Sequence, residues 1–335
     1  MRNSGSLIEK SDADTPQGLA FAVAAYVLWG FLPLYMKLVA HMSAAEVVTH
    51  RVIWSLPIAV VVLIVLRRTS DVRIALRSPK VLAMGCVTAA LISVNWGIYV
   101  WAISADHALD AALGYYINPL FSILLGAVLL GERLSRSQMA AIALAVGAVL
   151  ILTFDAGGIP WVSLGLMFSW GFYALAKKSL PIGPNQGFLL EVLILIGPAL
   201  VYFAYLAGTG QSHFAVGSGM DTWLLIGCGV VTAVPLMIYA NGAKLLRLST
   251  IAILQYIAPT MIFLFAVFAF NEPFGRARMI AFPMIWIALV IYTVSMLSQM
   301  RRKGDGDGRR KAKPHAGVEP ASSSYRPFWQ RKPGC

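Results

Sequence analysis

Residues 116–119 read Tyr-Ile-Asn-Pro, and residues 256–259 read Tyr-Ile-Ala-Pro. The offset between them is 256 − 116 = 140, and other pairs of residues repeat at or beside this offset. These pairs are Ile98-Tyr99 with Ile238-Tyr239, Glu132 with Glu272, and Trp29-Gly30-Phe31 and Lys37 with Trp170-Gly171-Phe172 and Lys178. Self-similarity at a fixed offset is typical of repeat architectures, so we interpret the chain as two related halves.

Both halves consist mainly of apolar segments long enough to cross a bilayer, which takes about 20 residues. The mean hydropathy is +0.72 and only 13% of residues are charged, against roughly 25% in soluble domains. We predict ten spans near residues 19–41, 45–66, 81–102, 108–130, 137–154, 161–177, 187–206, 222–244, 249–270 and 278–300. Each half holds five spans. Because five is odd, the second half enters the membrane in the opposite orientation, as in many secondary transporters.

The predicted fold is therefore an all-α integral membrane protein with ten transmembrane helices arranged as two inverted five-helix repeats. A polar N-terminal segment covers residues 1–18, and we expect the first span to be retained as an anchor, because no short signal-peptide core is evident. The repeats cover residues 19–155 and 160–300. Residues 301–335, rich in Gly, Arg, Lys, Pro and Ser, are expected to form a basic disordered cytoplasmic tail, whose contact with anionic lipid is one alternative.

Basic residues alternate between the expected loops and set the orientation. They follow every second span: Arg67, Arg68, Arg73, Arg77, Lys80, then Arg133, Arg136, then Lys177, Lys178, then Lys244, Arg247. The loops at 103–108, 155–160 and 207–221 contain neither Lys nor Arg. The positive-inside rule thus places both termini in the cytoplasm of a bacterial inner membrane, although Arg276 and Arg278 run against it. The net charge of +12 is accounted for by anionic lipid, so no nucleic-acid partner is expected.

Several stretches resemble a known group of membrane proteins. They are Tyr26-Val27-Leu28-Trp29-Gly30-Phe31-Leu32-Pro33-Leu34-Tyr35, Glu46-Val47-Val48-Thr49-His50-Arg51, Ser93-Val94-Asn95-Trp96-Gly97-Ile98-Tyr99-Val100-Trp101, and Tyr116-Ile117-Asn118-Pro119-Leu120 running to Gly131-Glu132-Arg133. Together they resemble the RarD proteins of the EamA family, in the drug/metabolite transporter superfamily, over roughly residues 18–300. The resemblance implies two EamA-type repeats, ten helices, an inner-membrane location and efflux of small metabolites or drugs.

We expect the substrate site near the prolines of the repeated motif, Pro119 and Pro259. A proline inside a span frees a backbone carbonyl and bends the helix, which helps to line a cavity. The polar and aromatic residues assigned to this central site are Asn118, Tyr115, Tyr116, Tyr256, Asn95 and Tyr99. Asn95 and Tyr99 are four residues apart and so share a helix face. For the asparagines, hydrogen bonds that join two helices are the alternative to substrate binding.

Charged residues within spans are the other candidates, because an unpaired charge in the membrane costs several kcal/mol. Arg51 is a candidate for attracting a carboxylate or phosphate group, and Glu191 and His50 are candidates for carrying a coupling proton. Snorkelling or backbone contacts for Arg51, a structural protonated donor for Glu191, and an interhelical hydrogen bond for His50 are the alternatives. Arg51 and Glu191 are equivalent in the two halves, so we expect them at opposite depths without a direct ion pair.

Trp29 and Trp170 fall near mid-span and could wall a cavity, or simply pack beside Gly30 and Gly171. Lys37 and Lys178 lie at span ends, where snorkelling explains them. Glu132 and Glu272 are expected to hold the helix that follows each, by capping or by pairing with Arg133 or Arg276. Small residues in span 5, such as Ala141, Ala145 and Ala148, suit close packing within the chain, and a homodimer is left open.

These features favour a secondary transporter of a small-molecule substrate in the lipid bilayer over other classes. No metal-ligand spacing, cofactor signature or nucleotide-binding loop is present, so we expect no metal, no cofactor and no direct use of ATP. A non-transporting sensor or scaffold is the first alternative. An integral membrane enzyme is the second, and its only compact acid/histidine group would be Asp106, His107 and Asp110.

Overall fold

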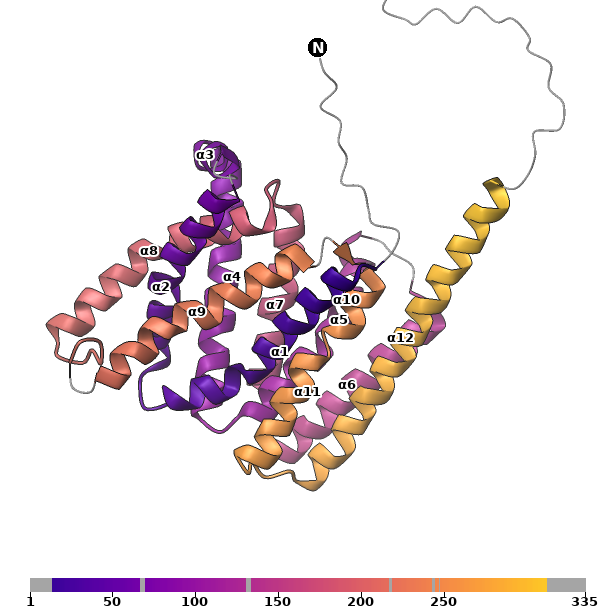
Figure 1. The fold of residues 1–335 in the computed structure, drawn as a ribbon. Helices are drawn as coiled ribbons and strands as arrows, with labels where there is room; N and C mark the ends of the chain where they lie inside the picture. Colours follow the sequence, from indigo (N-terminus) through magenta and orange to yellow (C-terminus); the bar gives the residue numbers. More distant parts are fainter. Residues whose placement is uncertain are drawn as a thin grey trace, which may run out of the picture. The chain divides into compact units, whose positions relative to one another are not determined.

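The computed structural model describes residues 14–66, 70–130, 134–216, 219–242, 245–246 and 248–311, and the regular structure in these ranges is helical (Figure 1). The chain divides into two units, Met1–Ser295 and Met296–Cys335. Everything described below concerns the first unit, except that the last helix continues into the second. Glu132 and residues 312–335 of the expected tail lie outside the described residues.

The helices follow the predicted spans closely. The first half contains α1 (Pro16–Leu38), α2 (Ala44–Val65), α3 (Ser70–Arg77), α4 (Pro79–Ser104), α5 (Ala108–Leu130) and α6 (Arg136–Ala156). The second contains α7 (Trp161–Ser179), α8 (Pro184–Gly208), α9 (Gly219–Gly242), α10 (Leu248–Leu254), α11 (Ile257–Leu264), the π-helix η2 (Phe265–Ala269) and α12 (Arg276–Lys311). Among the described residues, eight helices are long and apolar enough to cross a membrane: α1, α2, α4, α5, α6, α8, α9 and α12. The chain is thus an all-α, multi-pass membrane protein.

Polar residues at the helix starts explain where the helices begin. Thr15, Ser43 and Ser78 each cap a helix by accepting a hydrogen bond from a backbone amide of the first turn. Ser135 forms a reciprocal capping box with Gln138 at the start of α6, and that helix ends at Gly157 in the left-handed conformation (φ 64°). Such caps satisfy backbone groups that the helix leaves unpaired, so each apolar segment is closed by its own sequence.

Three features depart from the predicted spans. The loop expected after span 2 contains the short amphipathic helix α3. The span expected at 249–270 is interrupted at Gln255 and Tyr256 and ends in a π-helix, whereas its counterpart α5 is continuous despite Pro119. Finally, α12 continues past residue 300, where the disordered tail was expected to begin, to Lys311.

The closest helix packing joins the two halves of the chain. Helix α2 packs against α8 and α9, α7 lies against α4 and α5, and α1 packs against α9 and α11 (Figure 1). Glycines permit two of these contacts. A Cβ on Gly114 of α5 would lie 2.7 Å from the carbonyl oxygen of Ser163 in α7, and one on Gly229 of α9 would meet the backbone of Trp54 in α2. The small residues Ala141, Ala145 and Ala148 of α6 are buried within the chain.

Ion pairs close the end of the bundle that we expect to face outward. Lys37 pairs with Asp106, and Asp110 contacts both His107 (2.9 Å) and Arg278 (3.2 Å). The residues considered for an enzyme, Asp106, His107 and Asp110, therefore take part in separate structural contacts. Lys37 has a specific ion-pair partner, where only snorkelling was expected.

Glu272 also has a structural role at this end, but on a different helix from the one expected. Its carboxylate accepts hydrogen bonds from the amides of Ala108 (2.6 Å) and Leu109 (2.9 Å), so it caps α5 and does not hold the helix that follows it. Burial raises the pKa of this carboxyl, while the two amides and Arg278 act in the opposite direction.

Candidate functional site

Arg51 lies two turns into α2 and is only 3% exposed. Its Nε donates to Thr232 Oγ1 of α9 (2.9 Å), and its guanidinium lies over the Trp96 ring of α4, 4.7 Å from the ring centre. Within the described residues, Nη1 has no hydrogen-bond partner and no carboxylate forms an ion pair with the group. A buried cation with a free donor costs free energy unless a ligand completes it, so Arg51 is suited to bind an anionic group.

Beside Arg51, three helices contribute a polar and aromatic cluster. Asn95 of α4 donates to Ser169 Oγ (2.9 Å) and to the Leu166 carbonyl (3.3 Å), and its Oδ1 accepts from the hydroxyl of Tyr115 (3.2 Å). The Tyr115 ring of α5 lies 5.9 Å from that of Tyr99.

The aromatic contacts extend from this cluster toward α7 and back toward Arg51. The Tyr115 ring lies 6.3 Å from Trp170, and the Trp96 ring beneath the Arg51 guanidinium belongs to the residue next to Asn95. The Tyr99 hydroxyl is buried and, in the described part of the chain, unpaired. Five predicted residues thus meet: Arg51, Asn95, Tyr99, Tyr115 and Trp170. We call them, together with Trp96, the central cluster.

Glu191 is 1% exposed and paired, but not with Arg51. It accepts hydrogen bonds from Lys177 Nζ (2.6 Å) and from the Tyr173 hydroxyl (3.3 Å), both on α7. The Tyr173 ring lies 5.6 Å from Trp170, which places this ion pair next to the central cluster. The buried Glu191 carboxylate is therefore connected to the central cluster through the Tyr173 and Trp170 rings.

Comparison with known proteins identifies the group to which the chain belongs. The EamA-like transporter family matches residues 16–154. Protein RarD of Escherichia coli (strain K12) is 40% identical over 288 residues, which is 86% of this chain and 97% of that protein. An uncharacterized transporter of Vibrio cholerae serotype O1 is 40% identical over 284 residues, covering 85% and 94%. The chain is a RarD-type member of the EamA family.

More distant matches of this RarD-type protein cover a similar share of the chain. The chloramphenicol-sensitive protein RarD of Pseudomonas aeruginosa is 30% identical over 296 residues, covering 86% of this chain and 98% of that one. One crystal structure superposes with a TM-score of 0.55 at 17% identity, over 83% of this chain and 97% of the other. That likeness concerns the fold alone.

In the RarD-type chain, the remaining predicted site residues lie apart from the central cluster. Tyr116 faces the other side of α5, where its hydroxyl contacts Thr260 Oγ1 (2.8 Å) and its ring meets Phe282 and Trp286. Adjacent helix residues point about 100° apart, and here Tyr115 and Tyr116 contact different helices. Pro259 lies in α11, on this second side, while Pro119 lies within α5.

Three further predicted residues form no contact with the cluster that the structure records. Trp29 packs with Tyr26 and Tyr239, at ring distances of 5.6 and 5.5 Å. Tyr256 lies at the break between α10 and α11, and Asn118 has a buried Oδ1; within the described residues neither that oxygen nor the Tyr256 hydroxyl has a partner.

His50 bonds within its own helix, where an interhelical bond was expected. Its Nδ1 accepts from Trp54 Nε1 (3.2 Å) one turn away, and its ring stacks on Phe214 with 5.1 Å between centres. In the described ranges its Nε2 is unpaired.

Sequence reasoning missed Lys177, Thr232 and Ser169 as neighbours of the site. Lys177 was read only as a loop charge, although the short turn between α7 and α8 brings it within reach of Glu191. Thr232 and Ser169 are hydroxyl residues inside apolar helices, a signal that would have marked both as hydrogen-bonding positions.

Proposed function

We propose that the chain is a secondary transporter that moves a small molecule across the bacterial inner membrane by alternating access between two inverted five-helix repeats. The observation that carries the proposal is the central cluster itself. It joins helices of both halves around a buried arginine that has an unused hydrogen-bond donor. Sites at the interface of two repeats, near mid-membrane, are typical of such carriers.

The pattern of helix packing supports the repeats. Exchanging the halves replaces α1, α2, α4 and α5 by α7, α8, α9 and α11. The pairs α2–α9, α1–α9 and α1–α11 then become α8–α4, α7–α4 and α7–α5, and all six pairs are in contact. A matching set of contacts across the seam between the two halves is what an internal duplication produces.

The same packing supports ten spans. Helix α7 has 19 residues but carries three serines and two lysines, and the segment 257–269 is short. Both nevertheless pack between helices that are long enough to span: α7 between α4 and α5, and α11 between α1 and α5. Interrupted or polar segments are tolerated at membrane depth when protein surrounds them. With ten spans, the alternating loop charges leave both termini in the cytoplasm.

The chemistry of the cluster favours a substrate with an anionic group and a flat apolar part. The free donor of Arg51 suits a carboxylate or phosphate, and the neighbouring Tyr99 hydroxyl offers a second polar contact. Trp96, Tyr115 and Trp170 provide aromatic faces. A small aromatic or amphipathic carboxylate satisfies both requirements. Export is the direction that the family resemblance favours, and the Vibrio relative is also named a transporter.

Glu191 is the stronger of the two candidates for carrying a coupling proton. Its ion pair with Lys177 would have to open during a transport cycle if the carboxylate is to exchange a proton, and Tyr173 connects that event to the cluster. His50 is held by Trp54 and two phenylalanine rings, Phe203 and Phe214, away from the central cluster.

Flux in proteoliposomes tests the proposal. The purified chain is reconstituted, and uptake of amino acids, aromatic acids and chloramphenicol is measured with and without a pH gradient. We expect saturable flux of an anionic class. We expect Arg51→Gln to reduce it at least about 100-fold, because a charge-assisted contact of about 3 kcal/mol is lost, and Arg51→Lys to retain part of it.

Arg136→Gln is the matched control, because Arg136 is exposed at the start of α6 and distant from the cluster in the fold. Equal flux from wild type and Arg51→Gln would exclude Arg51 from the site. Saturable binding without flux of any compound under any gradient would instead identify a sensor or scaffold.

A further inference from the structure

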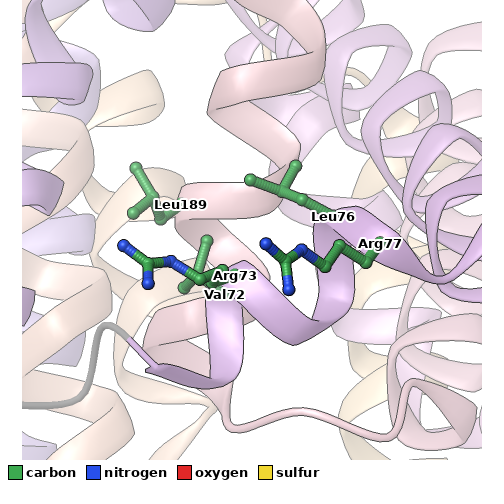
Figure 2. A pocket seen from close by; sticks show the side chains of 5 residues that line it. All are labelled: Val72, Arg73, Leu76, Arg77 and Leu189. Carbon is green, nitrogen blue, oxygen red and sulfur yellow. The ribbon is translucent and has the colours of Figure 1, made fainter.

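A hollow of about 320 Å³ lies between α3 and α8, outside the site described above. Its lining consists of Val72, Arg73, Leu76 and Arg77 from α3 and Leu189 from α8. Figure 2 shows these five side chains around the hollow, with both guanidinium groups extending in the same direction along α3. Apart from the two guanidinium groups, the lining side chains are aliphatic.

The amphipathic character of α3 explains this arrangement. Val72 and Ala75 are buried against the bundle, which fixes one face of the helix on α8 and α4. Arg73 and Arg77, one turn apart, are exposed, and neither forms an ion pair with a carboxylate that the structure describes. Leu76 is 44% exposed beside them. Two exposed cations next to exposed apolar surface suit a partner that is both anionic and apolar.

The place of α3 in the chain identifies that partner. The helix connects two membrane-spanning helices, α2 and α4, so it lies where the bilayer ends. The last turn of α2 is strongly apolar and exposed, with Ile64 at 59% and Val65 at 74% exposed. An amphipathic helix with arginines and leucine at this depth lies among lipid headgroups. Short helices of this kind gain binding energy from anionic lipid in addition to apolar burial.

We propose that the hollow between α3 and α8 binds an anionic phospholipid. Arg73 and Arg77 hold its phosphate, and Val72, Leu76 and Leu189 contact the start of an acyl chain. Arginine suits this role because its planar donors match phosphate oxygens in pairs. Since α8 carries Glu191 two residues after Leu189, the lipid would brace the helix that holds the buried ion pair. The binding claim itself does not depend on transport.

Lipid retention by the full-length chain tests this proposal. The protein is purified in detergent and titrated with phosphatidylglycerol or phosphatidylcholine, and bound lipid is counted by native mass spectrometry. We expect the wild type to prefer phosphatidylglycerol. We expect the double variant Arg73→Gln/Arg77→Gln to bind it roughly 30-fold more weakly and to lose the preference over phosphatidylcholine.

The control Arg136→Gln/Arg276→Gln removes the same charge from exposed positions outside the hollow and should keep the preference. Arg73→Lys/Arg77→Lys keeps the charge and should retain most of the binding; it also reports on folding if the glutamine variant is unstable. An equal loss in the control, or no loss in the glutamine variant, overturns the proposal. Competition by inorganic phosphate as strong as by phosphatidylglycerol also overturns it, because the site would then bind a soluble anion.

Discussion

At the scale of single residues, two buried charged side chains lie in opposite environments. Glu191 is satisfied by Lys177 and Tyr173, whereas Arg51 has a hydroxyl, an aromatic face and an unused donor. A paired buried charge stabilises one conformation. A buried charge with an unpaired donor can instead be stabilised by a bound ligand. This difference separates Arg51, the proposed binding group, from Glu191, which holds α7 and α8 together through its pair with Lys177.

We predict that Lys177→Met lowers the free energy of unfolding by about 3 kcal/mol, because it leaves the Glu191 carboxylate buried without its cation. The double variant Lys177→Met/Glu191→Gln removes both charges and should recover most of the loss. Thermal or denaturant unfolding in detergent measures both effects. If the double variant is no more stable than the single one, the ion pair is not what the lysine provides.

The sequence indicates which residues are chemically unusual better than it indicates which of them meet. Arg51, Asn95, Tyr99, Tyr115 and Trp170 stand out as polar or aromatic groups at membrane depth, and the structure brings them together. Tyr116 and Trp29 stand out for the same reason, yet they face other helices. Which side of a helix faces a partner depends on packing, and uniformly apolar spans carry little periodicity from which to predict it.

At the scale of elements, the helix ends were predictable, whereas the two prolines expected to bend their helices behave differently. Caps such as Ser135 with Gln138 are local, and so are the apolar runs between them. The break at Gln255 and Tyr256 lies one turn before Pro259, which has no amide hydrogen to donate to the Gln255 carbonyl. Its counterpart α5 has proline at the equivalent position and does not break. Proline alone therefore does not decide where a segment breaks, because the same residue type interrupts one segment and not its counterpart.

Close contact between α5 and α7 yields a prediction about glycine. Gly114→Ala would place a methyl group 2.7 Å from the Ser163 carbonyl oxygen and 3.1 Å from Leu166 Cβ, and backbone atoms cannot move aside cheaply. We expect a loss of about 1–3 kcal/mol in unfolding free energy, as for other overpacked sites. Gly97→Ala is the control, since no atom lies within 4 Å of its added methyl group. Comparable melting temperatures for the two variants would refute the close approach.

At the scale of the whole molecule, the orientation in the membrane can be tested with single cysteines. Gly158 lies in the turn between α6 and α7, with no atom within 4 Å of an added Cβ, and the loop charges place it outside. We predict that Gly158→Cys is labelled by a membrane-impermeant maleimide in intact spheroplasts, whereas Arg136→Cys is labelled only after permeabilisation. The native cysteines are first replaced by serine. The reverse labelling pattern would invert the proposed topology.

The interrupted ninth segment has a consequence for energetics in a carrier of this kind. In the proposed alternating-access cycle, two repeats of identical shape would give inward-facing and outward-facing forms that are related by a twofold rotation and equal in free energy. Here one half contains the continuous helix α5. The other half contains the short helices α10 and α11 and the π-helix η2 in the equivalent place. Bending an interrupted segment costs less free energy than bending a continuous helix, because fewer helical hydrogen bonds are strained. Under the proposed mechanism we therefore expect the two forms to be unequally populated at rest, so that the unloaded protein favours one side of the membrane before any gradient is applied.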